Sequence, residues 1–173
     1  MPQASQSVVR ATPDDAVALS TLAQRAYFDH FRYLWTDGGE AYVRETFATD
    51  RLRQESADDN VRHFMAWLGN RTVGYVKLNL RAPLDGVVGL ELHRIYLLAV
   101  AAGQGIGRRL VAEALRVAAE NQRPFVWLKV MRSSRASIAF YEKRGFRSYA
   151  ETTFAHPLLK PEYQDMLIMK KAL

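Results

Sequence analysis

The chain of 173 residues contains no cysteine. Disulfide bonds, a thiolate nucleophile and zinc sites built on cysteine ligands are therefore excluded. The sequence also lacks an apolar run of about 18 residues, the length that a membrane-spanning helix requires. It has no basic leader followed by an apolar stretch. These absences predict a soluble, cytoplasmic protein with no membrane partner.

No internal repeat, low-complexity tract or linker interrupts the sequence. A chain of this length with 49% hydrophobic residues can bury a core without metal or disulfide support. We therefore expect a single domain over residues 1–173, with no metal site.

The hydrophobic pattern predicts alternating strands and helices. Strands are expected at residues 7–11, 90–100, 125–130, 146–153 and 165–170, with a hairpin whose two-residue turn is Gly69-Asn70. Helices are expected from Thr12 through Ala26, over 40–47, as a turn near 50–55, from the glycines after residue 102 to Asn121, and over 133–145. This order predicts an α/β (α+β) fold with a mixed central sheet of about six or seven strands and helices on both faces.

Charge is unevenly distributed along the chain. Residues 101–147 hold ten Arg and Lys against three Glu, a net charge of +7, whereas residues 14–59 carry a net charge of −5. A bound anion would explain the first segment and a bound cation the second. Solvated helix faces explain both equally well.

The segment "AAGQGIGRRL" follows an expected strand and opens an expected helix. Backbone N–H groups at such a helix start bind anions. Gly103, Gly105 and Gly107 give G-x-G-x-G, which is neither a dinucleotide fingerprint nor a Walker A loop. Arg108 and Arg109 occupy the first helical turn, where the helix dipole disfavours cations. A bound phosphate would reverse that effect, although a purely structural turn is equally common.

Three segments in this order resemble the GNAT (Gcn5-related N-acetyltransferase) superfamily: "RIYLLAVAAGQGIGRRLV", "VWLKVMRSSRASIAFYEKRGF" and the terminal "QDMLIMKKAL". The resemblance covers the chain closely from about Leu90 to the C-terminus and more loosely over the N-terminal third. Within the superfamily, "ELHRIYLL" and "DHFRYLWTDGGEAYVRETF" look most like the PaiA-like polyamine acetyltransferases. The resemblance implies a GNAT fold and acetyl-CoA as cosubstrate. Dimers are frequent in that superfamily, so a homodimer is one expected assembly.

The resemblance also implies where acetyl-CoA binds. Its pyrophosphate would lie on the loop formed by Gly103, Gln104, Gly105, Ile106, Gly107 and Arg108, and its pantetheine on the strand backbone at Ile95, Tyr96 and Leu97. The side chain that usually opens the loop is missing, because Ala102 stands there. Gln104, Arg108 and Arg109 are the candidate replacements. Ser134 stands where an asparagine usually contacts CoA.

Acetyl transfer to an amine requires a base for the amine and an acid for the leaving thiolate. Tyr141 matches the superfamily's general acid, and its alternative role is packing on the sheet. His93 matches the strand position at which several members keep a catalytic Glu. Strict alternation would put Glu91, His93, Ile95 and Leu97 on one face and Arg94 on the other. Glu91 is then a second candidate base, or a partner that orients His93; both are equally explained as structural residues.

The acceptor is expected at the acidic N-terminal segment, where aromatic and acidic side chains attract ammonium groups. The candidate acceptor residues are Tyr33, Trp35, Asp37 and Glu40. They favour a small cationic amine or a polyamine, although surface acids over a helix core explain them too.

The leading interpretation is an acetyl-CoA-dependent N-acetyltransferase acting on the primary amine of a small molecule. A family member that binds acyl-CoA without turnover is the first alternative, and Ala102 and Ser134 favour it. A basic nucleic-acid-binding module is the second, based only on the net charge of +6. Since the bound cofactor already explains that charge, we expect no nucleic-acid partner.

Overall fold

The computed structural model describes residues 5–173, so the first four residues of the expected 1–173 domain lie outside the described part. One seven-stranded sheet runs through it in the order β1-β2-β3-β4-β5-β7-β6. All neighbouring strands are antiparallel except β4 and β5. The strands are β1 (Gln6–Arg10), β2 (Val61–Leu68), β3 (Arg71–Leu84), β4 (Val87–Leu97), β5 (Phe125–Met131), β6 (Arg147–Thr153) and β7 (Asp165–Ala172).

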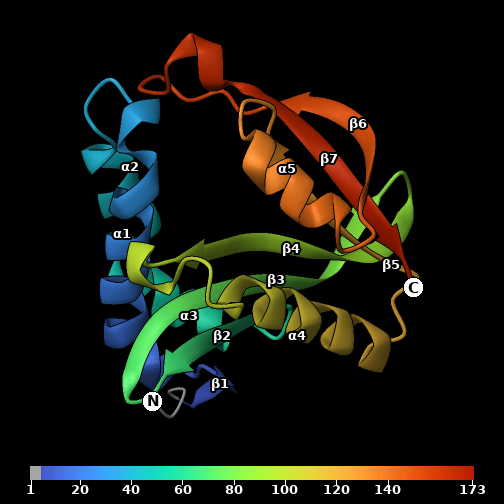
Figure 1. The fold of residues 1–173 in the computed structure, drawn as a ribbon, viewed down its shortest axis with the longest axis horizontal. Coiled ribbons are helices and arrows are strands. Elements are labelled where there is room, and N and C mark those ends of the chain that lie inside the picture. The colour runs from blue at the N-terminus through green and yellow to red at the C-terminus, as the bar shows by residue number, and fades with distance from the viewer. Residues whose placement is uncertain (1–4) are drawn as a thin grey trace.

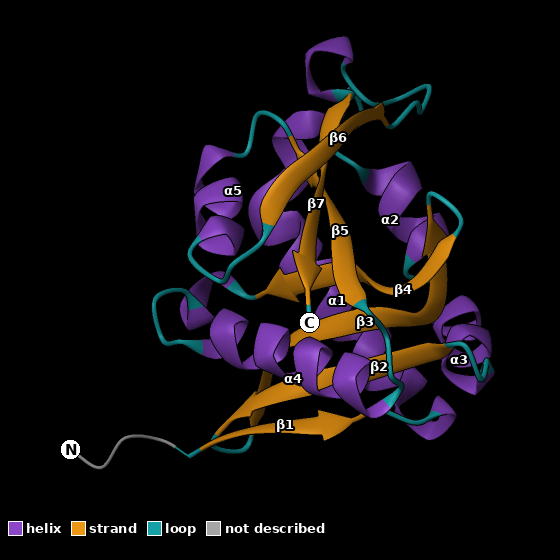
Figure 2. Ribbon diagram, turned by 90° about the vertical axis from the view of Figure 1, so that its right-hand side faces the viewer, coloured by secondary structure: helices purple, strands orange, loops and turns teal. Residues whose placement is uncertain are grey.

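Helices cover both faces of the sheet (Figures 1 and 2). One face carries α1 (Ala16–Phe31), α2 (Glu40–Thr46) and α3 (Thr49–Ala57), and the other carries α4 (Ile106–Glu120) and α5 (Arg135–Glu142). Short 3-10 turns lie at Pro13–Asp15, Arg32–Leu34, Ala99–Ala101 and Pro161–Tyr163. The predicted mixed sheet with helices on both faces is confirmed. No helix within residues 5–173 has the length and apolarity to cross a membrane.

Helix α4 has its apolar residues at the spacing that the sequence predicts. Leu110, Val111, Ala114, Val117 and Ala118 recur at helical spacing and are all buried against the sheet. The polar side chains of the helix point outward. The helix therefore forms because one side of it completes the larger hydrophobic core.

Two elements differ from the expectation. Strand β4 ends at Leu97 rather than at residue 100, and the chain then forms the 3-10 turn Ala99–Ala101. The expected turn near residues 50–55 is a complete helix, α3, anchored by the fully buried Leu52.

Strands β4 and β5 are paired over only a short stretch. The register joins Leu90 to Val126 and Glu91 to Trp127, and no further pair is formed between them in the described chain. At the paired end, Gly89 lets the Phe125 ring approach so closely that an added Cβ would lie 2.2 Å from it. Beyond that end the two strands separate, which leaves one edge of β4 without a strand partner.

A β-bulge interrupts β4 at the start of this opening. Lys77 of β3 is opposite Arg94, but Leu78 is opposite Leu92, so His93 is an extra residue with no partner. The bulge shifts the alternation by one residue. The predicted common face of Glu91, His93, Ile95 and Leu97 is therefore wrong: Glu91 and Arg94 share the α3 face, whereas Ile95 and Leu97 pack into the α4 core.

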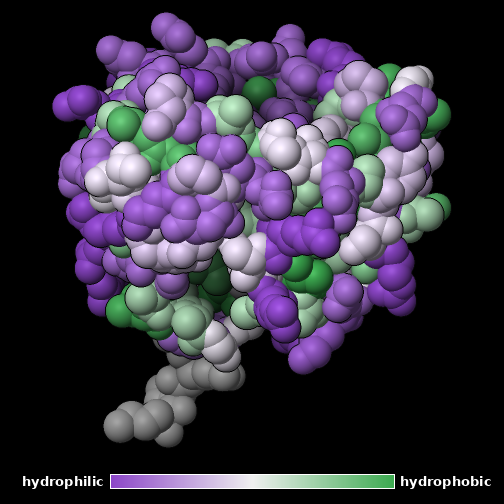
Figure 3. Space-filling model, turned by 90° about the horizontal axis from the view of Figure 1, so that it is seen from above, coloured by the Kyte–Doolittle hydropathy of each residue, from purple (hydrophilic) through white to green (hydrophobic). Residues whose placement is uncertain are grey.

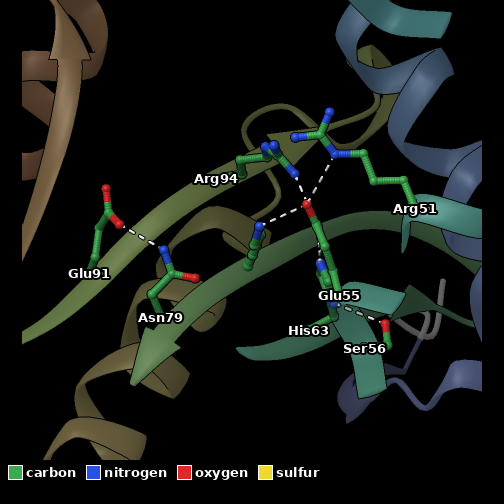
Figure 4. A network of polar contacts seen from close by, with 8 residues as sticks. Arg51, Glu55, Ser56, His63, Asn79, Glu91 and Arg94 are labelled. Carbon is green, nitrogen blue, oxygen red and sulfur yellow. Dashed lines mark hydrogen bonds and ion pairs between the residues drawn. The ribbon is translucent and has the colours of Figure 1, made fainter. Parts of the chain in front are cut away.

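Glu55 of α3 binds the sheet beside this bulge (Figure 4). Its carboxylate lies 3.0 Å from Lys77 Nζ, 3.4 Å from Arg94 Nη1 and 3.6 Å from His63 Nε2. These partners come from three adjacent strands, and their side chains are almost fully buried. Burial alone would raise the pKa of Glu55, but His63, Arg94 and Lys77 outweigh it and hold the pKa well below its usual value.

We predict that Glu55→Gln destabilises the fold at neutral pH by about 3–5 kcal/mol, because it leaves buried cations without their carboxylate. A carboxylate with a lowered folded-state pKa stabilises the fold above its usual pKa of 4.5 and loses that effect as the pH falls below it. The variant and the wild type should therefore converge in acid. Urea denaturation over a pH series measures this.

Asp50→Asn is the control on the same helix, because among residues 5–173 Asp50 forms one ion pair, an exposed one with Arg53. It should change the stability by less than about 1 kcal/mol. An equal loss for Glu55→Gln at acid and neutral pH would mean that the carboxylate charge contributes nothing.

Candidate active site

Two neighbouring cavities lie along β4 and the elements around it. The central cavity opens where β4 and β5 separate, and the loop cavity surrounds the glycine segment. Seen from above, the surface shows hydrophobic side chains in recesses between hydrophilic ones (Figure 3). The loop cavity is formed by Leu97, residues 101–108, Phe140 and Arg144.

The glycine loop has the backbone that anion binding requires. Gly103 and Gly105 have φ angles of +74° and +80°, and Gly105 caps the N-terminus of α4. A Cβ on Gly107 would lie 3.2 Å from the Phe140 ring, so its absence brings α4 and α5 close together. The unpaired N–H groups at the start of α4 therefore lie beside the loop cavity, together with the positive end of the helix dipole.

Two arginines lie at this loop. Arg108 lines the loop cavity as expected, and it is joined by Arg144, whose guanidinium stacks 3.5 Å above the Phe140 ring. Desolvation, followed by the charge of Arg108, lowers the pKa of Arg144. Arg108 and Arg144 repel one another beside the free N–H groups at the start of α4. A phosphate group would neutralise both cations and accept hydrogen bonds there. Arg144 was missed because "EKRGF" reads as an ordinary helix end.

The other candidate side chains at the loop have protein partners. Arg109 Nε donates to Gln6 Oε1 at 2.7 Å, so it ties α4 to β1. Gln104 Nε2 donates to the Val100 carbonyl at 2.7 Å. Gln104 therefore folds the loop onto itself, and Arg108 is the better replacement for the side chain missing at Ala102.

The unpaired edge of β4 connects the two cavities. Ile95 and Tyr96 line the central cavity, and Leu97 lines the loop cavity. The Leu97 carbonyl accepts a hydrogen bond from His30 Nε2 at 2.9 Å, so it is already engaged. The residues present thus fit an elongated molecule with a phosphate end at the loop and an extended arm along β4.

Tyr141 lies where α5 meets the central cavity. Its side chain is 6% exposed, and its ring packs between Phe140 and Phe146 at centroid distances of 5.2 and 5.7 Å. Burial raises the pKa of its hydroxyl well above the usual value. The phenol is therefore protonated at neutral pH and can donate a proton. Ser134 also lines this cavity, and its Oγ donates to Ser137 Oγ at 2.8 Å.

His93 and Glu91 occupy different places, contrary to the predicted shared face. His93 is exposed along the wall of the central cavity. Surrounding protein atoms and the charge of Arg94 lower the pKa of the imidazole, which is therefore neutral at neutral pH. Glu91 is buried outside the cavity and accepts a hydrogen bond from Asn79 Nδ2 at 2.7 Å (Figure 4). Of the two, only His93 lies where a substrate amine could reach it.

Of the four expected acceptor residues, Trp35 lines the central cavity. It stacks on Tyr42 with ring centroids 4.5 Å apart, and its Nε1 donates to Tyr27 Oη at 2.9 Å. Phe154 and Tyr96 extend this aromatic wall. The wall was not foreseen as a unit, because it gathers side chains from α1, α2, β4 and the segment after β6.

The other three expected acceptor residues lie outside the central cavity. Asp37 accepts hydrogen bonds from the N–H groups of Gly39 and Ala41, at the start of α2. Glu40 forms an exposed ion pair with Arg32 at 3.0 Å. Tyr33 is 52% exposed and packs edge-on against Tyr163. Turn and helix-start preferences explain the presence of Asp37 and Glu40 at this segment, and aromatic packing explains that of Tyr33.

The chain is similar in sequence and in fold to known acetyltransferases. An uncharacterised N-acetyltransferase in the pepI 3′ region of Lactobacillus delbrueckii subsp. lactis is 27% identical over 135 residues, which is 76% of each protein. The PaiA N-acetyltransferase of Thermoplasma acidophilum, solved in complex with coenzyme A, superposes with a TM-score of 0.79 at 20% identity over 98% of this chain and 99% of that one. The ribosomal-protein-S18-alanine N-acetyltransferase of Escherichia coli gives 0.70 at 20% identity over 97% and 94%.

The two structural likenesses confirm the predicted fold. The model of the acetyltransferase (GNAT) family matches residues 21–146, which is most of the chain and includes the loop, His93 and Tyr141. This protein therefore belongs to the acetyltransferase (GNAT) family.

Proposed function

We propose that this chain transfers the acetyl group of acetyl-CoA, the donor of its family, to the primary amine of a small molecule. The observation that carries the proposal is the order of the lining residues along the unpaired edge of β4: Leu97 lines the loop cavity, and the preceding Ile95 and Tyr96 line the central cavity, which also holds His93 and Tyr141. In this proposal, Arg108, Arg144 and the N–H groups at the start of α4 bind the pyrophosphate. The backbone of Ile95 and Tyr96 pairs with the pantetheine arm.

Tyr141 and His93 would then divide the proton transfers. The amine arrives protonated, because an alkylammonium has a pKa of about 10.4. Neutral His93 accepts its proton, directly or through water, and the free amine attacks the thioester carbon. Tyr141 donates its phenolic proton to the sulfur as the bond to the acyl carbon breaks, and the second proton of the attacking nitrogen then returns to the Tyr141 phenolate. The products are the acetylated amine and coenzyme A.

A small cationic amine or a polyamine is one candidate acceptor, and the aromatic wall around Trp35 and Tyr42 favours it, since aromatic faces attract ammonium groups. The two acids first assigned to this role, Asp37 and Glu40, are engaged at the start of α2 and with Arg32. The charged side chains that line the cavity itself therefore discriminate between acceptor classes.

Purified protein incubated with acetyl-CoA and a panel of amines tests the proposal, with free thiol and product mass as readouts. We expect Tyr141→Phe to lower kcat by about 100- to 10,000-fold, the range typical of a lost general acid, with little change in KM for acetyl-CoA. Tyr149→Phe, on exposed β6, is the control and should retain full activity. Binding of CoA without acetylation of any amine by the wild type would instead establish a non-catalytic binder.

The base is tested by a pH profile. We expect His93→Gln to lower kcat/KM most strongly near neutral pH and to recover toward alkaline pH, where the acceptor loses its proton unaided. In the wild type, the acid limb should lie below the usual imidazole pKa of 6.5, because desolvation and Arg94 lower the pKa of His93. A deficit that stays constant over the whole pH range would exclude His93 as the base.

A further inference from the structure

The charged side chains that line the central cavity all carry positive charge. They are Arg94 from β4 and Lys129 from β5, and no aspartate or glutamate is among the residues that line this cavity in the described chain. The lining also includes the aromatic wall around Trp35. A polycationic acceptor would bring further positive charge to two existing cations, which is unfavourable in a site partly screened from water.

Arg94 in particular is incompletely neutralised. Its side chain is 7% exposed and, among residues 5–173, makes one hydrogen bond, at 3.4 Å to Glu55. The same carboxylate also neutralises buried Lys77, so two buried cations share one partly exposed carboxylate. Close to them, the hydroxyl of Tyr75 is fully buried and has no hydrogen-bond partner in that part of the chain. Buried charges are normally paired, so this side of the cavity lacks an anion.

The phosphates of coenzyme A do not supply that anion under the proposed function. Arg108 and Arg144 form a separate cationic site at the glycine loop, and neither lines the central cavity. Arg94 instead follows His93 in the sequence, beside the proposed base. The group that complements it must therefore arrive with the acceptor.

We propose that the acceptor is an amine that also carries a carboxylate, attached to an apolar or aromatic body, and that Arg94 binds this carboxylate. This inference rests on the proposed function. The amine is directed toward His93, and the body of the molecule packs on the wall around Trp35 and Tyr42. Arg94 is then the residue that determines acceptor specificity, and Glu55 holds its guanidinium in place.

Acceptors matched in size and differing in charge test the inference on the wild-type enzyme. One series is γ-aminobutyrate, butylamine and putrescine, and a second pair is phenylalanine and phenethylamine. We expect the carboxylate-bearing member of each set to have the highest kcat/KM. A preference for putrescine, or for butylamine and phenethylamine, would overturn the inference. Either result would leave the proposed function intact. No turnover of any amine would overturn the proposed function itself.

Arg94→Gln and Arg51→Gln form a matched pair of variants, because both arginines contact Glu55 but only Arg94 lines the cavity. We expect Arg94→Gln to raise KM for the carboxylate acceptors by roughly 10- to 100-fold, the effect of losing a hydrogen bond between charged groups. KM for butylamine and phenethylamine should stay nearly constant. Arg51→Gln should leave both classes unchanged. An equal effect of Arg94→Gln on both classes would assign Arg94 a purely structural role and overturn the inference.

Discussion

The functional architecture depends on the brief pairing of β4 with β5. Two residue pairs hold the strands together at one end, where Gly89 admits the Phe125 ring. Past them the strands diverge, which interrupts the sheet and leaves backbone groups of β4 without a strand partner. A sheet edge of this kind normally invites association with another strand. Here it lies inside the molecule between two cavities, so an extended small molecule is the natural occupant.

The bulge at His93 and the ion pairs of Glu55 act on the same point of the sheet. The bulge turns an otherwise regular strand residue toward the opening and brings Arg94 beside Lys77. Glu55 then fixes both cations from the α3 side. A buried ion pair is a poor source of net stability, because desolvation offsets much of the attraction. Here the ion pair has a positional role, because it holds the Arg94 guanidinium in place at the cavity.

The sequence predicted what local patterns control. The glycine loop, α4 and the hairpin at Gly69-Asn70 follow from short-range spacing, and the family resemblance implies the donor and the role expected of Tyr141. The bulge could not be foreseen, because an inserted residue leaves no trace in the alternation until its partners on β3 are known. The partners of Glu55 come from three different strands, and no local sequence pattern indicates that their side chains meet. Asp37 caps the start of α2, and its sequence pattern does not separate that role from ligand binding, because both use the same side chain.

Backbone hydrogen exchange with and without coenzyme A tests the central claim most directly, namely that the unpaired β4 edge and the glycine loop form one binding path. The account predicts that coenzyme A protects the amides around Ile95–Leu97 together with those of residues 103–108, while exchange in β2 stays unchanged. Protection of the loop without any change along β4, or of neither segment, would contradict it.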